Sequence, residues 1–232
     1  MSPAAAVTAQ EPSRAAFFDV DETLIAAKSM FAFWDFWVAR GGRDGTPPTG
    51  DTPPPSDRAA LNRAHYRRYS GARADELNTA GQEWYDTYRA TPAAFVTASL
   101  AALRRHRAAG HAVVLVSGSA DPMLRPLARD LGATAVLCTE LLVGDDGLLT
   151  GEVRAPMIGP AKAEAVGSFL ERHELSAADS HAYGDHSSDL DMLRAVGHPA
   201  VIGDDPELTR WAVREGWTRL PATTGPGGRP PR

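Results

Sequence analysis

The chain has little cysteine, no long apolar run and no excess of positive charge. Its single cysteine, Cys138, excludes an internal disulfide, and such a low cysteine content is typical of a reducing, cytoplasmic compartment. Because Cys138 lies in an apolar, strand-like run, we expect an inert buried thiol. No segment approaches the ~20 apolar residues of a membrane span, so we expect no membrane partner. The net charge of −5 argues against nucleic-acid binding.

Length and composition predict a globular protein. A chain of 232 residues, 43% hydrophobic and 23% charged, accommodates one core domain with a small second domain. Residues 1–13 lack the basic start and long apolar core of a signal peptide, which predicts a disordered lead. Residues 41–56, rich in Gly, Pro, Thr and Asp, predict a flexible loop, and residues 221–232, rich in Pro and Gly, predict a disordered tail.

Two carboxylates follow an apolar run near the start of the chain. Residues 15–18 predict a buried strand of a parallel sheet, which places Asp19 and Asp21 at its carboxyl end. Open α/β sheets bind ligands at that edge. Residues two apart on a strand share a side, and neighbouring carboxylates need a shared proton or a hard cation such as Mg²⁺. Alone, however, a D-x-D after a strand is common in proteins without this chemistry.

Further polar residues follow predicted strands or begin a predicted helix. They are Ser117 and Gly118 after the strand at 112–116, Lys162 early in a helix, and Asp185 and Asp189 after the strand at 181–183. Because the strand ends of a parallel sheet lie along one edge, these groups are expected to converge. The set suits a phosphoryl group attacked by a carboxylate beside Mg²⁺. Each has an ordinary alternative, since a Ser-Gly pair is often a turn and a helical lysine is usually on the surface.

These motifs resemble those of the haloacid dehalogenase superfamily of phosphatases. The four stand in the family's order: D-V-D-E-T from Asp19, V-S-G-S from Val116, Lys162, and G-D-H-S-S-D from Gly184. The resemblance covers roughly residues 14–217 and is greatest to the branch of the phosphoserine phosphatases. It implies a Rossmann-like α/β core, residues 14–27 and 91–220, with a small all-helical cap, residues 28–90, inserted after the first strand.

The resemblance also implies roles for individual residues. Asp19 is expected to attack phosphorus and form an aspartyl-phosphate, and Asp21 to act as acid and then base. Lys162 is expected to neutralise charge on Asp19 and the phosphoryl group, while Ser117 and the Gly118 N–H hold phosphoryl oxygens. The implied Mg²⁺ ligands are Asp19, Asp21 through its backbone carbonyl, Asp185, and Asp189 either directly or through water or Lys162.

The match departs from the phosphoserine phosphatases at the substrate end. Those enzymes place a Glu nine residues after the nucleophile, facing the substrate's ammonium group, and this chain has Lys28 there. Either Lys28 binds a carboxylate, a second phosphate or a polar sugar, or it points to water. Ser188 stands where those enzymes tend to have Asn. His186 replaces a small residue, and either touches the leaving group or lines the entrance.

The remaining pattern predicts the connecting elements. They are an aromatic-rich helical segment at 30–38, helices at 57–70, 73–89, 91–109 (with Thr91 as N-cap) and 161–173, a strand at 134–138 and a hairpin at 141–153. Pro122 falls in the first turn of another helix, which Pro126 is expected to kink or to start later.

The sequence therefore predicts a Mg²⁺-dependent phosphomonoesterase acting on a small phosphorylated metabolite. One alternative transfers the phosphoryl group from the same intermediate to an acceptor other than water. The other is a non-catalytic, receiver-like signalling domain in which an Asp is phosphorylated. Receivers place their acidic pair on an earlier strand and lack a helical insertion after the acceptor, whereas here Asp21 lies two residues beyond Asp19 and an insertion follows.

Overall fold

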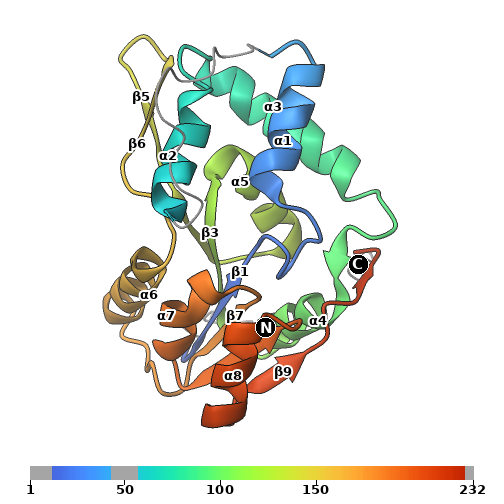
Figure 1. Ribbon diagram of the computed structural model, residues 1–232, viewed down its shortest axis with the longest axis vertical. Helices are drawn as coiled ribbons and strands as arrows, with labels where there is room; N and C mark the ends of the chain where they lie inside the picture. The colour runs from blue at the N-terminus through green and yellow to red at the C-terminus, as the bar shows by residue number, and fades with distance from the viewer. Residues whose placement is uncertain (1–11, 43–56, 228–232) are drawn as a thin grey trace, which may run out of the picture.

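A six-stranded parallel sheet forms the centre of the computed structural model, which describes residues 12–42 and 57–227 (Figure 1). The strand order is β4-β3-β1-β7-β8-β9, and every neighbouring pair is parallel. The strands are β1 (Ala15–Asp19), β3 (Ala112–Ala120), β4 (Ala135–Thr139), β7 (His181–Gly184), β8 (His198–Ile202) and β9 (Thr218–Leu220). The predicted α/β class is confirmed.

Strand β1 is apolar throughout because it is central to the sheet. Its side chains alternate between the two faces: Ala16 and Phe18 belong to one hydrophobic cluster, and Ala15 and Phe17 to the other. Phe18 stacks on Tyr183 of β7 with ring centroids 4.3 Å apart. All five strand residues are buried. This position carries the chain from the core directly to the carboxyl edge, where Asp19 ends the strand.

Helices cover both faces of the sheet. One face packs against α4 (Thr97–Ala108) and α5 (Asp121–Leu131), the other against α6 (Pro160–Arg172), α7 (Leu190–Arg194) and α8 (Pro206–Glu215). A short 3₁₀ turn, η1 (Ser187–Asp189), precedes α7. Within residues 12–42 and 57–227, no helix combines the length and apolar character needed to cross a membrane.

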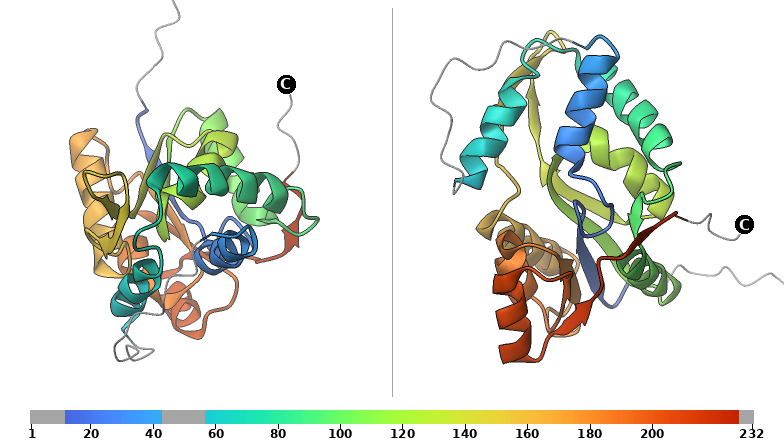
Figure 2. Two further views of the ribbon diagram at one scale, coloured as in Figure 1. Left: turned by 90° about the horizontal axis from the view of Figure 1, so that it is seen from above. Right: turned by 45° about the vertical axis from the view of Figure 1, so that its right-hand side comes forward.

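The three helices between β1 and β2 form a layer over the carboxyl edge of the sheet (Figures 1 and 2). They are α1 (Ser29–Ala39), α2 (Arg58–Arg67) and α3 (Ala74–Tyr88). Their shared core is aromatic: Phe33 packs against Trp37, Tyr69 and Trp84. This is the helical cap expected after the first strand, although its exact division from the core stays a prediction.

A β-hairpin lies beside these helices. Strands β5 (Leu141–Val143) and β6 (Leu149–Val153) are antiparallel, as the D-G turn predicts. The N–H of Gly71 donates to the carbonyl of Leu149, and the N–H of Leu149 to the carbonyl of Ala72, each at 2.8 Å. The hairpin, assigned to the core by its place in the chain, is thus hydrogen bonded to the α2–α3 connection.

The structure corrects two expectations. The helix expected from Thr91 begins at Thr97, because Phe95–Val96 form strand β2, antiparallel to β10 (Thr224–Gly225). The same pairing corrects the predicted disorder of residues 221–232, since β10 orders part of that tail. The predicted lead falls mostly, and the predicted loop almost wholly, outside the described residues, as do residues 228–232.

Candidate active site

A buried ammonium group bridges two carboxylates at the carboxyl edge of the sheet. Lys162 Nζ donates to Asp19 Oδ1 and to Asp189 Oδ1, both at 2.6 Å. The Lys162 side chain is only 5% exposed, and its partners are 8% and 2% exposed. Removing one partner from such a buried pair leaves an uncompensated charge, which is strongly destabilising. Lys162, the third residue of α6, is therefore part of the interior and not a surface lysine.

A third carboxylate, Asp185, joins this group from the end of β7. Its Oδ1 accepts a hydrogen bond from Thr23 Oγ1 at 2.8 Å. One oxygen each of Asp19, Asp185 and Asp189 lies within 4.8 Å of the others. Strands β1 and β7 are neighbours in the sheet, so two segments far apart in sequence supply these acids. Three carboxylates beside one lysine leave an excess of negative charge.

Burial and neighbouring negative charge both affect the ionisation of Asp19 and Asp185. Burial raises the pKa of Asp19 well above its ordinary value, although the charge of Lys162 opposes this. Burial, together with the charge of Asp189, raises the pKa of Asp185 to about 6. The donor atoms in the cluster are all carboxylate oxygens, the ligands that hard divalent cations prefer. The residues present therefore fit a divalent metal, whose charge would favour their ionised forms.

Asp21 occupies a different environment two residues after Asp19. Its Oδ1 accepts a 2.6 Å hydrogen bond from Ser29 Oγ at the start of α1, and its Oδ2 accepts one from Ser119 Oγ at 3.3 Å. Burial raises the pKa of Asp21, partly offset by the hydrogen bonds from Ser29. The two hydroxyl groups orient the carboxyl group, and the raised pKa favours a form that can donate a proton.

Ser117 and Gly118 lie where β3 reaches the same edge. Ser117 is buried, and its Oγ accepts a hydrogen bond from the Ser119 N–H at 3.0 Å. The Gly118 carbonyl accepts hydrogen bonds from Asn62 Nδ2 and Thr139 Oγ1, both at 2.8 Å. A Cβ at position 118 would lie 3.1 Å from Ile158 Cγ1, so the site leaves little room for a larger residue.

One cavity of about 110 Å³ brings the predicted residues together. Its lining includes every residue that the sequence predicted for the site: Asp19, Asp21, Lys28, Ser117, Gly118, Lys162, Asp185, His186 and Asp189. The sheet alone explains this convergence for the residues that end β1, β3 and β7. Lys28 and His186 reach the cavity from connecting segments.

Lys28 is exposed and His186 is half-buried, and both have partners. Lys28 Nζ lies 3.3 Å from Glu22 Oε2, with both side chains about half exposed. The ring nitrogens of His186 lie 3.0 and 3.1 Å from Arg58 Nη1. Burial and the charge of Arg58 lower the pKa of His186. This part of the cavity thus carries two cations, from Lys28 and Arg58, beside one acid.

The cavity also contains residues that motif reasoning missed. They are contributed by α1, by α2 and by the segment before α6, and they are Met30, Phe31, Arg58, Asn62 and Ile158. They belong to no short motif, so their sequence spacing carries no signal beyond their place in the predicted cap. Asn62 is notable because its Oδ1 is buried without a hydrogen-bond partner among the described residues.

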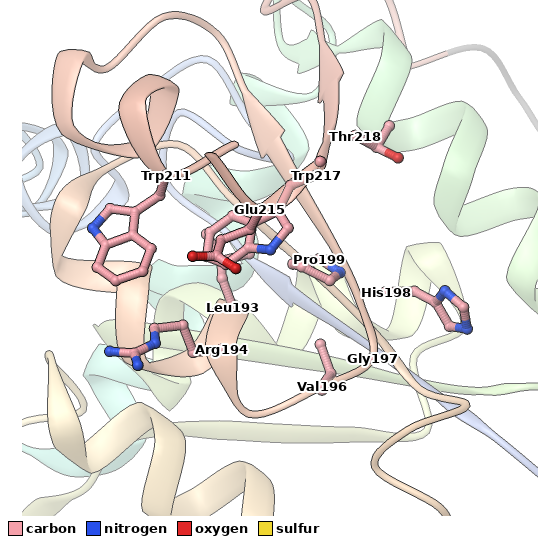
Figure 3. Close-up of a pocket in the computed structure, with 11 residues that line it drawn as sticks. Leu193, Arg194, Val196, Gly197, His198, Pro199, Trp211, Glu215, Trp217 and Thr218 are labelled. Carbon is pink, nitrogen blue, oxygen red and sulfur yellow. The ribbon is translucent and has the colours of Figure 1, made fainter. Parts of the chain in front are cut away.

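A second and larger cavity, about 400 Å³, lies elsewhere, at the amino-terminal end of β8. Trp211, Trp217 and Arg194 contribute to its lining (Figure 3). It contains none of the predicted site residues and no carboxylate cluster. Cavity volume alone therefore does not identify the active site, and the smaller cavity holds the candidate active site.

Comparison with known proteins agrees with this geometry. Residues 16–194 match the sequence model of the haloacid dehalogenase-like hydrolases. The chain belongs to this family. A probable phosphatase of Mycobacterium tuberculosis is 31% identical over 237 residues, covering 92% of this chain and 77% of that protein. The inhibition of morphological differentiation protein of Streptomyces azureus is also 31% identical, over 230 residues, covering 90% and 78%. A histidinol-phosphatase of Neisseria meningitidis is 25% identical, covering 88% and 97%.

Solved structures share the fold of this haloacid dehalogenase-like hydrolase. A Bordetella pertussis protein of unknown function has a TM-score of 0.76 at 24% identity, covering 91% of this chain and 99% of that one. Apo phosphoserine phosphatase has a TM-score of 0.64 at 16% identity, covering 92% and 95%. Family membership and phosphatase relatives identify an enzyme that hydrolyses a phosphorylated substrate. The expected phosphatase class is confirmed, and the receiver-like alternative is wrong.

Proposed function

We propose that this phosphatase is a Mg²⁺-dependent phosphomonoesterase that forms an aspartyl-phosphate on Asp19 and acts on a small phosphorylated metabolite. The observation that carries the proposal is the Lys162 bridge: one buried ammonium group holds Asp19 and Asp189 at 2.6 Å. The charge of Lys162 opposes the burial that raises the pKa of Asp19, so it favours the ionised nucleophile, and it offsets charge on the phosphoryl group. Positioning and charge stabilisation are the main requirements of phosphoryl transfer.

Asp19 is the nucleophile in the first step. Its Oδ1 is held by Lys162, so the other carboxylate oxygen is the one that attacks phosphorus. A bond forms between that oxygen and phosphorus as the bond from phosphorus to the ester oxygen breaks. Ser117 and the N–H of Gly118, in the carboxyl-terminal half of the neighbouring strand β3, hold the nonbridging oxygens during this transfer.

Asp21 moves the proton in both steps. An alkoxide leaves poorly at neutral pH, so protonated Asp21 gives its proton to the ester oxygen as that bond breaks. The resulting carboxylate then takes a proton from the water that attacks the aspartyl-phosphate, which releases phosphate and restores Asp19. The burial that raises the pKa of Asp21 and the hydroxyl groups that orient it support this assignment.

The metal would be held by carboxylates already gathered in the cavity. Asp19 and Asp185 are the proposed side-chain ligands, and Asp21 contributes its backbone carbonyl. Asp189 acts through Lys162, because its Oδ1 accepts from Lys162 and its Oδ2 accepts from the His186 N–H at 3.4 Å. When bound, Mg²⁺ would supply positive charge to the phosphoryl oxygens and to the acid cluster.

The cavity sets limits on the substrate. The cavity is small, about 110 Å³, which supports a small phosphorylated metabolite as the proposed substrate. Lys28 and Arg58 line it, so we propose a substrate with a second anionic or strongly polar group near them. Glu22 offsets part of the Lys28 charge.

A phosphate-release screen tests this proposal. The enzyme is assayed with Mg²⁺ over a panel of phosphorylated metabolites that includes phosphoserine and histidinol phosphate, the substrates for which relatives are named. We expect turnover of a small monoester and loss of activity in excess chelator. Full activity in chelator would contradict the metal assignment, and turnover of none of the small monoesters would contradict the substrate class.

A further inference from the structure

A cluster of imidazoles lies at the opposite edge of the sheet from the candidate active site. The side chains of His106, His111 and His181 each place a ring nitrogen within 4.8 Å of the others. They come from the end of α4, the residue before β3 and the first residue of β7. This is the amino-terminal edge of the strands, away from the cap helices (Figure 1).

The backbone explains why these residues meet. The N–H of His111 donates to the carbonyl of His106, and the N–H of Gly110 to that of Arg107, both at 3.0 Å. Gly110 has φ 74°. This Schellman turn, which favours glycine in the left-handed position, folds His111 back toward His106. Their Nδ1 atoms lie 2.9 Å apart. His181 faces the same region because β7 lies next to β1 in the sheet.

We infer that His106, His111 and His181 form a binding site for a transition-metal divalent cation of the Zn²⁺ class, separate from the carboxylate site. Three imidazole nitrogens are the donor set that Zn²⁺, Ni²⁺ or Cu²⁺ prefers, whereas Mg²⁺ and Ca²⁺ require oxygen ligands. Three protein ligands also leave a position for water. The chain then has a site with carboxylate ligands for a hard cation at one edge of the sheet and a metal site with nitrogen ligands at the other.

An outer hydrogen bond supports this assignment. His106 Nε2 lies 2.8 Å from the hydroxyl of Tyr183, which points from β7 on the same face as His181. Metal-binding histidines usually donate their second ring N–H to such a partner, which fixes the tautomer and turns the other nitrogen toward the ion. With Nε2–H given to Tyr183, His106 presents its Nδ1 lone pair to His111, whose Nδ1 lies 2.9 Å away.

The protonation of the three imidazoles also suits metal binding. Burial lowers the pKa of His106 and of His181 to about 4 and also lowers the pKa of His111, which favours the neutral imidazole, the form that binds metals. Without metal, the Nδ1 atoms of His106 and His111 share one proton. On binding, that proton moves to the outward Nε2 of His111. The nearby charges of Arg14 and Arg105 oppose any cation and so favour an ion with strong affinity for nitrogen.

Titration of the untagged full chain with Zn²⁺, in competition with a chromogenic chelator, tests the site. Excess Mg²⁺ is present to occupy the carboxylate cluster. We expect one equivalent of Zn²⁺ per chain, retained by Asp185→Asn and weakened at least about tenfold by either His111→Asn or His181→Gln. Both histidines are only partly buried, so these variants are expected to fold, with far-UV circular dichroism as the check. Co²⁺ in place of Zn²⁺ gives an independent optical signal.

Two further variants make the test specific. His173→Gln changes an exposed histidine outside the cluster and should bind Zn²⁺ like the wild type. Tyr183→Phe keeps the ring stack on Phe18 but removes the hydroxyl, and should weaken binding about tenfold or more. Absence of Zn²⁺ binding beyond what Asp185→Asn removes would overturn the inference. Wild-type affinity in both His111→Asn and His181→Gln would also overturn it.

Discussion

Asp19 and Asp21 are two residues apart, yet the structure gives them different chemical surroundings. Asp19 is paired with a buried cation, whereas Asp21 receives hydrogen bonds from two serine hydroxyl groups. Two carboxyl groups with different environments are a common basis for dividing nucleophile and acid roles. The sequence predicted both residues, because they follow a strand within a motif. The sequence did not predict the hydrogen bond from Ser29 to Asp21, because that bond depends on how α1 packs beside β3.

The acid role of Asp21 makes a kinetic prediction. In Asp21→Asn, phosphoenzyme formation should slow about 10²–10⁴-fold for an alkyl phosphate, the usual value of general acid catalysis. It should slow much less for p-nitrophenyl phosphate, whose leaving group departs without a proton. Rapid-quench measurement of the burst separates this step from later hydrolysis. Equal slowing of the burst with both substrates would be evidence against the acid role.

Lys28 makes a prediction about substrate choice. If its ammonium group contacts a second anion of the substrate, Lys28→Glu should raise KM for the best substrate of the metabolite screen. A hydrogen bond to a charged group contributes about 1.5–3 kcal/mol, so the change in kcat/KM should exceed tenfold. The same variant should favour an ammonium-bearing substrate, so L-phosphoserine is the matched comparison.

The outcome separates the two roles left open for Lys28. Opposite changes in kcat/KM for the two substrates would support a contact with substrate. Unchanged values for both would mean that Lys28 serves only its surface pair with Glu22, whose side chains are about half exposed.

At the scale of elements, the sequence was sufficient where one local pattern determined the outcome. The buried strand before Asp19, the hairpin around its D-G turn and the helix bearing Lys162 all form close to the predicted bounds. The predicted start of α4 was six residues too early, because a Thr-Pro pair taken alone is typical of a helix start. Its competitor, the pairing of Phe95–Val96 with Thr224–Gly225, involves residues over a hundred positions away.

Helix α5 contains an interior proline and packs closely against α3. It runs from Asp121 through Pro126 to Leu131, and it starts no later despite the proline. Pro126 has no N–H to donate to the carbonyl of Pro122. Helix α3 approaches that carbonyl at Gly81, where a Cβ would lie only 1.9 Å from the oxygen. A glycine in α3 therefore permits the close contact between α3 and α5.

This contact predicts that Gly81→Ala destabilises the protein. The methyl group must displace one of the helices, and such overpacking costs about 1–3 kcal/mol. Gly167→Ala in α6 is the control, because a Cβ there meets nothing within 4 Å. The control should be neutral or more stable by about 0.5–1 kcal/mol, the helix preference of Ala over Gly. Urea unfolding measures both, and equal stabilities of the two variants would refute the packing argument.

At the scale of the molecule, the parallel sheet explains why the motif residues of the site could be predicted from the sequence. Asp19 ends β1, Ser117 lies in the carboxyl-terminal half of β3, and Asp185 directly follows β7, so topology brings them together once these neighbouring strands are identified. The cap residues Arg58 and Asn62 could not be found in this way. Their approach depends on how α2 packs over the core, which is a tertiary property without a short sequence signal.

The aromatic core of the cap predicts a dependence of stability on pH. His65 is buried between aromatic rings of the cap, and burial together with the charge of Arg68 lowers its pKa from 6.5 to about 4. The unfolded chain binds this proton below pH 6.5 and the folded chain does not, so stability falls as pH decreases from 6.5 toward 4. The loss amounts to about 3 kcal/mol.

Comparison with His65→Gln isolates this contribution from other acid-sensitive groups. Urea unfolding is measured for both proteins between pH 7 and pH 4.5. The free energy of unfolding should fall more steeply for the wild type than for the variant over this range. Parallel curves would show that His65 does not titrate differently in the two states.

The most direct test of the account is to detect the phosphoryl group on Asp19. The enzyme is mixed with Mg²⁺ and a substrate from the screen, quenched in acid within one turnover and analysed by peptide mass spectrometry. We predict one phosphoryl group on the peptide that contains Asp19, and none in Asp19→Asn or in excess chelator. Turnover by a folded Asp19→Asn variant, or a phosphoryl group on another residue, would contradict the central claim.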